Sequence, residues 1–250
     1  MLRGALFISL LLTLVGCGTV GPVQPLQKAL PQAVNNATVQ QKGLALLLAW
    51  DIPTSNQDDS ALTDLAGFAV YKTDYDLAKG CPECRPPKTL LRKIDLDYYR
   101  SSNRNSQRIY LWDSAVEEET GYSYKIVPYT DAGHEGGATL LHRACFTTAS
   151  AVTELSAQGL DSQVRLTWIA AGENRQGIEL LGYNIYRRSG KEYFAAQPIN
   201  EQPITATGYD DLNVENGKDY TYAVRTVIAI GDLQLESTLS AEAIARPNRP

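Results

Sequence analysis

The chain consists of two halves that repeat the same succession of short apolar and aromatic blocks, so the two halves are expected to share one fold. Early in the repeat the matching residues lie 115 positions apart, as Gly67 and Gly182 do. Later they lie 98 positions apart, as Asp113 and Asp211 do. The other matching pairs are Trp50 and Trp168, Tyr71 and Tyr186, Val116 and Val214, Tyr122 and Tyr220, Tyr124 and Tyr222, and Gly133 and Gly231. The change in spacing indicates about 17 extra residues in the first half, before Asp113.

The blocks have the composition and periodicity of β-strands. They are rich in β-branched and aromatic residues, and alternation along the chain places Tyr122, Tyr124 and Ile126 on one face. Clusters of Gly, Asn, Asp and Pro separate the blocks at intervals that suit a β-sandwich. No segment carries a convincing amphipathic helix of ten or more residues. The sequence therefore predicts an all-β chain with two tandem domains, 31–148 and 149–247.

The order of the motifs resembles the fibronectin type III family. Each half contains L-x-W, then G-[FY]-x-[IV]-Y, then D-x-x-V and Y-x-Y-x-[IV]. The resemblance implies two immunoglobulin-like sandwiches of seven strands in two sheets, with Trp50, Trp168 and the paired tyrosines as core and corner residues. Two departures stand out: Glu119 occupies the place of Gly217, and the first half carries a long insertion around 75–106.

The N-terminus has the pattern of an export signal. Residues 1–16 hold one charge, Arg3, and an apolar run too short to span a bilayer. The sequence Leu-Val-Gly-Cys at 14–17 resembles the bacterial lipobox, which implies cleavage before Cys17 and its modification by fatty acyl chains such as palmitate. The residue after Cys17 is a glycine and not an aspartate, which resembles sorting to the outer membrane. Residues 17–30 are then the lipidated cysteine and a semi-extended tether.

Three further cysteines would meet the oxidising environment of an exported protein. They are Cys81 and Cys84, in Cys-Pro-Glu-Cys, and Cys145. A structural disulfide, either within that loop or from it to Cys145, is the favoured interpretation. A zinc-type site formed by the three cysteines and His142 is an alternative, although residues three apart on a strand point to opposite faces. A thiol-redox role is a further alternative, without the βαβ pattern that usually accompanies it.

The order of strands also predicts how the two domains meet. The linker at 147–152 is short, so the domains should touch, end to end. The Cys-Pro-Glu-Cys loop should then face segments 171–180 and 229–234 of the second domain.

The insertion contains the strongest candidate for a binding surface. Its segment 96–108 combines Tyr98 and Tyr99 with Arg100, and aromatic residues with arginine are enriched at recognition surfaces. One of the two tyrosines should pack beneath the loop, since neighbouring residues of an extended chain face opposite ways. A plain disordered loop tip is the alternative.

The charge and the residue composition argue against two classes of function, nucleic-acid binding and catalysis. The formal net charge of −5 argues against nucleic acid, which requires a clustered basic face. The chain has two histidines and no nucleophile motif such as G-x-S-x-G, so we expect no enzyme and no cofactor beyond the lipid on Cys17. The sequence thus favours a lipid-anchored binding or spacer module of the bacterial envelope, attached to the membrane and contacting a protein or polysaccharide. A metal- or redox-linked accessory lipoprotein that uses the cysteines is the alternative.

Overall fold

A computed structural model describes residues 29–102, 106–173 and 175–249. The expected signal peptide, Cys17 and nearly all of the tether lie outside the described residues, so the lipid anchor stays a prediction. Among the described residues, no helix has the length and apolar character needed to cross a bilayer.

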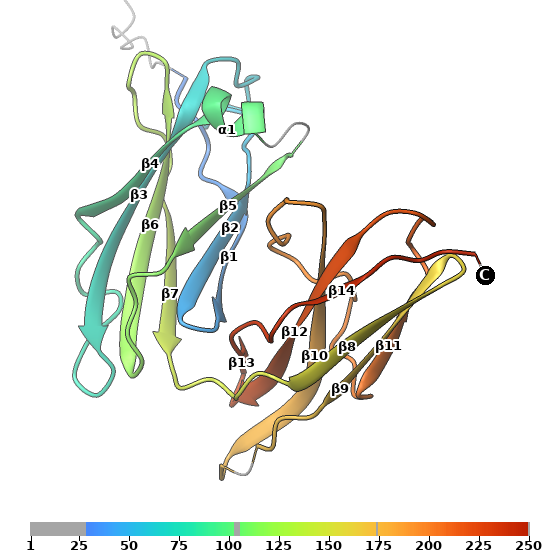
Figure 1. The fold of residues 1–250 in the computed structure, drawn as a ribbon. Helices are drawn as coiled ribbons and strands as arrows, with labels where there is room; N and C mark the ends of the chain where they lie inside the picture. The colour runs from blue at the N-terminus through green and yellow to red at the C-terminus, as the bar shows by residue number, and fades with distance from the viewer. Residues whose placement is uncertain (1–28, 103–105, 174, 250) are drawn as a thin grey trace, which may run out of the picture.

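The first sandwich places three strands of a seven-stranded sheet, which continues into the second sandwich, against a sheet of four strands (Figure 1). The first sheet has the order β1 (Asn35–Lys42), β2 (Ala45–Asp51) and β5 (Arg108–Asp113). The second has the order β4 (Thr89–Asp95), β3 (Leu65–Asp76), β6 (Thr120–Thr130) and β7 (Thr139–Cys145). Every pair within this sandwich is antiparallel. The insertion supplies β4 and one short helix, α1 (Leu96–Ser102), neither of which appears in the repeat pattern.

The second sandwich repeats the plan without a counterpart of β4. One sheet has the order β8 (Thr153–Leu160), β9 (Gln163–Ile169) and β11 (Gly208–Asp211). The other joins β10 (Ile178–Ser189) and β12 (Tyr220–Ile230) to β13 (Leu233–Glu236) and β14 (Ala243–Ala245). The all-β prediction is confirmed, because the chain forms two tandem sandwiches of the fibronectin type III-like kind.

The two cores are built from matching residues. Trp50 is fully buried and meets Phe68 edge to face, with ring centroids 5.5 Å apart. At the equivalent place in the second sandwich, Trp168 meets Tyr183 at 5.4 Å. Such pairs stabilise a core beyond the burial of apolar area. The tryptophans are therefore structural, as the family resemblance implies.

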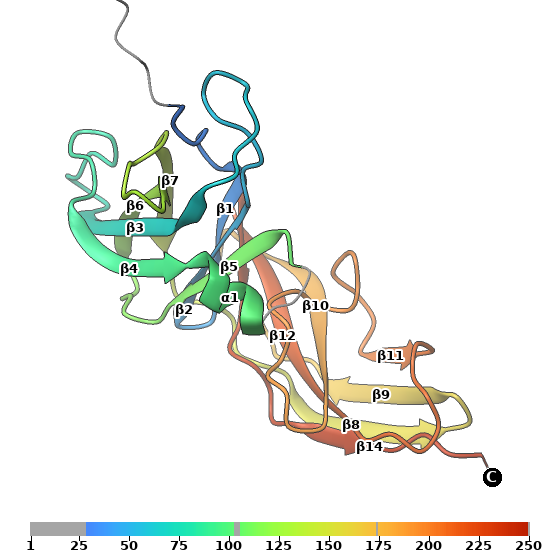
Figure 2. The ribbon, with the colours of Figure 1, turned by 90° about the horizontal axis from the view of Figure 1, so that it is seen from above.

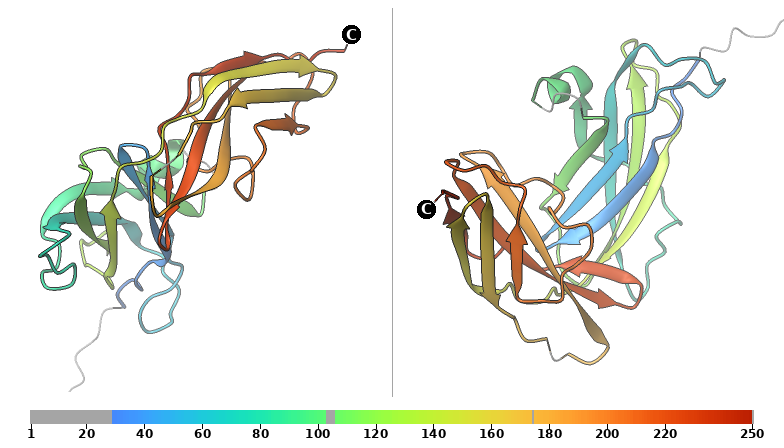
Figure 3. Two further views of the ribbon diagram at one scale, coloured as in Figure 1. Left: turned by 90° about the horizontal axis from the view of Figure 1, so that it is seen from below. Right: turned by 90° about the vertical axis from the view of Figure 1, so that its right-hand side faces the viewer.

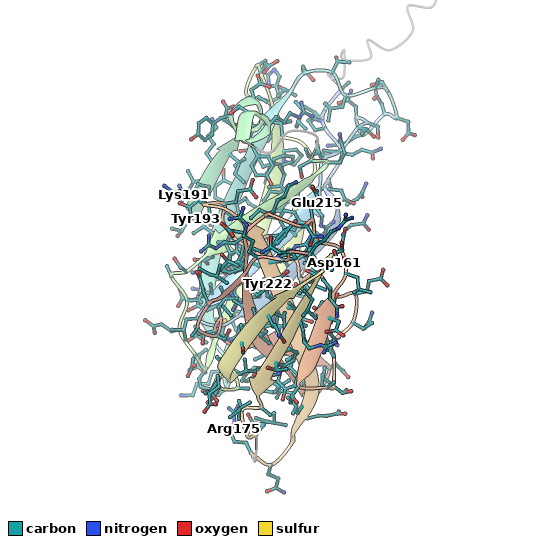
Figure 4. All side chains as sticks on the ribbon, turned by 45° about the vertical axis from the view of Figure 1, so that its right-hand side comes forward. Asp161, Arg175, Lys191, Tyr193, Glu215 and Tyr222 are labelled. Atoms are coloured by element: carbon teal, nitrogen blue, oxygen red, sulfur yellow. A yellow bond between two sulfur atoms is a disulfide. The ribbon has the colours of Figure 1, made fainter. Side chains whose placement is uncertain are left out.

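Each core also contains a buried tyrosine and a buried aspartate that contact a partly exposed cation. Tyr124 donates a hydrogen bond of 2.7 Å to Asp113, and the Lys72 ammonium lies 2.7 Å from the same carboxylate. The corresponding residues of the second sandwich are Tyr222, Asp211 and Arg187, with distances of 2.9 and 2.7 Å. The repeat thus extends to the hydrogen bonds of the core. Tyr222, which belongs to β12, is labelled in Figure 4.

The departure at Glu119 has a measurable consequence. Glu119 has φ of 55° and its counterpart Gly217 has φ of 82°, a region that L side chains occupy at a cost. Replacing Glu119 by glycine is expected to raise the free energy of unfolding by about 0.5–1 kcal/mol, because the relief of strain exceeds the entropy that glycine adds to the unfolded chain. Equilibrium chemical denaturation would measure the change.

The matched control for Glu119→Gly is Gly217→Ala. A Cβ at position 217 meets nothing within 4 Å, so this substitution adds backbone strain without a clash. It should lower stability by about 1 kcal/mol. Equal effects of the two substitutions, or a loss of stability in Glu119→Gly, would contradict the role of the left-handed backbone here.

The two sandwiches touch, but they are not arranged end to end. Their long axes form a V instead of a continuous rod (Figures 1 and 3). The reason is that β13 pairs with β1 in parallel, with Lys42 opposite Glu236, and so joins one sheet of each sandwich. Gly43, with φ of 64°, permits this approach, because a Cβ there would lie 3.0–3.2 Å from Thr238. The prediction of an end-to-end arrangement is wrong.

The cysteine loop does not face the second sandwich either. It follows β3 and lies on the side of the first sandwich away from the second (Figures 1 and 2). Segment 229–234 meets other residues of the first sandwich, since Arg143 donates to the carbonyl of Gln234 at 2.5 Å. Arg175 bonds the linker carbonyls of Thr147 and Thr148 at 3.0 and 3.2 Å.

Candidate binding surface

Helix α1 divides the two adjacent tyrosines of the insertion between solvent and core. The carboxylate of Asp95 accepts a hydrogen bond from the Tyr98 amide at 2.9 Å and so caps the helix. Leu96 is buried in the core, and Tyr99 packs against it. Tyr98 is 77% exposed. One tyrosine does pack beneath the insertion as predicted, although a helix separates the two side chains and not an extended chain.

Tyr99 ties α1 to the edge of β5. Its hydroxyl donates to the carbonyl of Arg108 at 3.2 Å and accepts from the amide of Tyr110 at 3.1 Å. Burial raises the pKa of Tyr99, so the hydroxyl keeps its proton at neutral pH. These bonds hold α1 in one orientation and therefore fix where Tyr98 points.

Arg100 lies at a cavity between α1 and the connection from β2 to β3. The cavity has a volume of about 170 Å³ and is lined by Ile52, Pro53, Thr54, Leu62, Thr63, Leu65, Leu96, Arg100 and Gln107. The exposed Arg100 guanidinium carries N–H hydrogen-bond donors in a fixed planar geometry. It lies beside the apolar side chains that line the cavity. An arginine and a tyrosine on one short helix can thus bind a partner through both apolar area and hydrogen bonds.

The cysteine loop is closed by a disulfide between Cys81 and Cys84, with an S–S distance of 2.17 Å. The loop covers Ser123, whose hydroxyl lies 3.0 Å from the carbonyl of Pro82 and 2.8 Å from Nδ1 of His142. Ser123 is fully buried, so its contacts with Pro82 and His142 anchor the loop and do not present a nucleophile to solvent. A cavity of about 350 Å³ lies beneath the loop.

Cys145 is neither bridged nor available as a ligand. It is a free thiol buried in the first core, and burial raises its pKa to about 11. The interpretation of a disulfide within the loop is confirmed, and the alternative bridge to Cys145 is wrong. The zinc-type set of Cys81, Cys84, His142 and Cys145 is not assembled, because two of its thiols are bonded to each other. Within the described residues, no group of three or more His, Cys, Asp or Glu could hold a metal ion.

A polar cluster at the junction of the sandwiches was not predicted from the sequence. Lys42 of β1 enters the second sandwich and lies 2.9 Å from Glu236 and 2.6 Å from the hydroxyl of Tyr186. Asn184 and Tyr186 donate to the same carboxylate at 2.9 and 2.6 Å, and Arg225 lies 3.6 Å from it. Burial lowers the pKa of Lys42, an effect that the Glu236 carboxylate opposes. No local motif marks these residues, since their partners lie up to 194 positions away.

Comparison with known proteins gives distant likenesses. No protein-family model matches the chain. A stretch of 90 residues is 32% identical to an amylopullulanase of Thermoanaerobacterium thermosulfurigenes, covering 36% of this chain and 4% of that enzyme. A solved Fn3-like protein from Clostridium thermocellum is 31% identical, with 42% of this chain and 96% of that chain covered and a TM-score of 0.32. The chicken CNTN1 FN1-FN3 domains are 16% identical, with 87% of this chain and 69% of that chain covered and a TM-score of 0.35.

These likenesses do not assign an activity. The match to the amylopullulanase spans a small fraction of that enzyme's length, and the TM-scores are low. The fold instead follows from the strand order, in which the paired strands of each half form two layers around a separate core. The chain is therefore a pair of fibronectin type III-like sandwiches, joined at a polar junction, with a helical insertion on the first.

Proposed function

We propose that this chain is a non-catalytic binding or spacer module of the bacterial cell envelope, anchored in the outer membrane by acyl chains on Cys17. It contacts a protein or a polysaccharide through the surface formed by Tyr98 and Arg100. The observation that supports this proposal best is the exposure of Tyr98 on a helix held by the buried Leu96 and the bonded Tyr99.

The rigidity of α1 favours recognition over a disordered loop tip. A side chain that is already held in place loses less conformational entropy when a partner binds. Tyrosine and arginine are also the residues that most often carry the binding energy of interfaces. The polar cluster at the junction keeps the two sandwiches in one arrangement, which suits a module that must present a surface at a fixed position.

The location of α1 restricts the partner's distance from the membrane. The chain enters the first sandwich at the same end, where Pro31 bridges Asn56 in the connection that lines the Arg100 cavity. Ala29 lies twelve positions after Cys17, and a fully extended tether of that length reaches about 40 Å. The partner would therefore meet α1 within several tens of ångströms of the bilayer.

The binding role can be tested by crosslinking in native membranes. The double substitution Tyr98→Ala and Arg100→Ala should abolish the crosslinked adducts that the unmodified chain forms. The matched control is Tyr193→Ala, which removes a tyrosine that is 98% exposed on the second sandwich (Figure 4). Adducts that persist in the double variant, or that Tyr193→Ala removes equally, would contradict a binding role for α1.

The anchor requires a separate measurement. Replacing Cys17 by serine should prevent acylation, and the mass of the exported protein should then lack the lipid. If the unmodified protein carries no fatty acyl chain on Cys17, the anchor is wrong, whatever the crosslinking shows.

The disulfide loop supports a second candidate, a redox-linked accessory lipoprotein. Cys81 and Cys84 are both exposed, so external thiols can reach the bond. Partner adducts that depend on Cys81 and Cys84, and not on Tyr98, would favour this candidate.

A further inference from the structure

A cavity lies on the seven-stranded sheet at the place where this sheet passes from one sandwich to the other. It is lined by residues of the neighbouring strands β1, β13, β12 and β10, and by segment 197–203, which runs beside β10. Its volume is about 220 Å³. The four strands meet at the junction of the V (Figure 1), so both sandwiches contribute to this junction cavity.

Glutamine is the commonest residue in the lining. Five of the thirteen glutamines of the chain line the junction cavity, namely Gln40, Gln41, Gln197, Gln202 and Gln234. In the part of the chain that the structure describes, no lysine, arginine or aromatic residue lines it. A side-chain amide offers two hydrogen-bond donors and one acceptor oxygen without net charge. The lining therefore suits a neutral ligand whose groups both donate and accept hydrogen bonds.

The deepest polar groups of the cavity are held in place by the protein itself. Asn184 is buried, donates to Glu236 at 2.9 Å and accepts from Asn200 at 3.0 Å. Asn200 also accepts from the Ile185 amide at 2.7 Å, which ties segment 197–203 to β10. The charge of Glu236 is neutralised by Lys42 at 2.9 Å. A ligand would thus meet a surface that is already ordered, and binding to it costs less conformational entropy.

Four of the five glutamine side chains are available to a ligand. Gln40, Gln197, Gln202 and Gln234 are exposed, and within the described residues their side-chain amides bond no other group of the protein. Gln41 differs, because it is buried and donates to the Phe146 carbonyl at 2.7 Å. The four available amides come from β1, β13 and segment 197–203. Their convergence on one cavity from three separate segments is the observation that points to a ligand.

We propose that the junction cavity binds one residue of a neutral polysaccharide, at a site separate from the surface on α1. A sugar hydroxyl donates one hydrogen bond and accepts others, so neighbouring hydroxyls of one ring can bond several amides at once. Pro198 and Pro203 also line the cavity and supply apolar contact for the C–H groups of the ring. Interfaces between domains are a common location for such sites, in which a few polar groups fix the orientation of the ligand.

The size and charge of the junction cavity restrict the ligand further. Its volume of about 220 Å³ is below the range of about 300–1,000 Å³ that holds drug-sized ligands, so one sugar ring enters and its neighbours in the chain stay outside. The exposed carboxylate of Glu201 at the cavity repels a uronic acid or a phosphate group, and no cation in the lining compensates for it.

A glycan array tests the class of sugar, with the full chain in detergent as the binding protein. We expect binding to neutral oligosaccharides and no binding to oligosaccharides of uronic acids. Isothermal titration calorimetry then measures the Kd of the full chain for the neutral oligosaccharide that binds best. Absence of binding to every neutral glycan, or binding confined to anionic or cationic glycans, would overturn the proposal.

One substitution in each sandwich tests whether the sugar lies between them. Gln40→Met in β1 and Gln202→Met in segment 197–203 keep the length of the side chain and remove the amide. Each should raise the Kd about fivefold, because a hydrogen bond to a sugar hydroxyl is lost. Both side chains are exposed, so thermal unfolding of the free variants should match that of the unmodified chain. An effect of only one of the two substitutions on the Kd would contradict a site shared by both sandwiches.

Two controls separate the junction cavity from the rest of the molecule. Gln158→Met removes an exposed amide from β8, outside the cavity, and should leave the Kd unchanged. The double substitution Tyr98→Ala and Arg100→Ala should also leave it unchanged, so this proposal and the binding role of α1 can fail independently. A Kd that either control raises as much as Gln40→Met does would place the sugar elsewhere and overturn the proposal.

Discussion

Replacing Asp113 by alanine is expected to lower the stability of the first sandwich by about 3–5 kcal/mol. The buried carboxylate accepts hydrogen bonds from Tyr124 at 2.7 Å and from the Ala115 amide at 3.1 Å, and it pairs with Lys72 at 2.7 Å. Without it, the tyrosine hydroxyl stays in the core with no acceptor, and the partly exposed Lys72 ammonium keeps only the Ala115 carbonyl. Burial already raises the pKa of Tyr124, so this hydroxyl cannot ionise to compensate.

Equilibrium unfolding in guanidinium chloride would measure the effect. Tyr124→Phe is the matched control, because it removes one hydrogen bond and keeps the ring, and it should cost about 1 kcal/mol. The combined substitution Lys72→Met, Asp113→Leu and Tyr124→Phe should recover much of the loss, since it leaves no buried charge unpaired. A loss below about 1 kcal/mol for Asp113→Ala would show that water replaces the carboxylate.

The second sandwich of the chain allows the same experiment to be repeated on the equivalent residues. Asp211 accepts from Tyr222 and pairs with Arg187 in the same geometry, so Asp211→Ala should cost a similar amount in the second sandwich. The two effects should be independent, because the cores are separate clusters.

The sequence predicts the fold well in the segments whose motifs occur in both halves of the chain. Two occurrences of the same aromatic residues at fixed spacing show that Trp50 and Tyr124 belong to a core and not to a ligand site. Glu119 also stands out only because Gly217 shows what that turn prefers. Residues without a counterpart are harder to interpret, which is why strand β4 and helix α1 in the insertion were not predicted.

The candidate site is predicted only in part. Tyr98 and Tyr99 can be identified as a pair from composition and loop length, but which of them is exposed depends on the helix. The bonds of Tyr99 to Arg108 and Tyr110 depend on how that helix lies against β5. The relation between the sandwiches is harder still, because Lys42 finds its partners only after both have folded. The V shape follows from that junction and not from the motifs of either half.

Replacing Lys42 by methionine should loosen this junction while both sandwiches stay folded. The Lys42 side chain is 1% exposed and lies between Glu236 and Tyr186, which belong to the second sandwich. Its loss leaves the buried carboxylate with only the more distant Arg225, at 3.6 Å, as a cation. Removing one partner of a desolvated charge pair at an interface costs about 2–5 kcal/mol. We expect the contact between the sandwiches to weaken by an amount in this range.

Small-angle X-ray scattering and amide exchange together test this prediction. The variant should have a larger radius of gyration, and the Gly43 amide, which donates to the Glu236 carbonyl at 2.8 Å, should exchange faster. Lys93→Met is the matched control, because that lysine lies over the Tyr129 ring on the first sandwich, away from the junction. Unchanged scattering and exchange in Lys42→Met would mean that the paired strands β1 and β13 hold the V without the charge. The rigidity of the module would then come from main-chain bonds, which no side-chain substitution at the junction could remove.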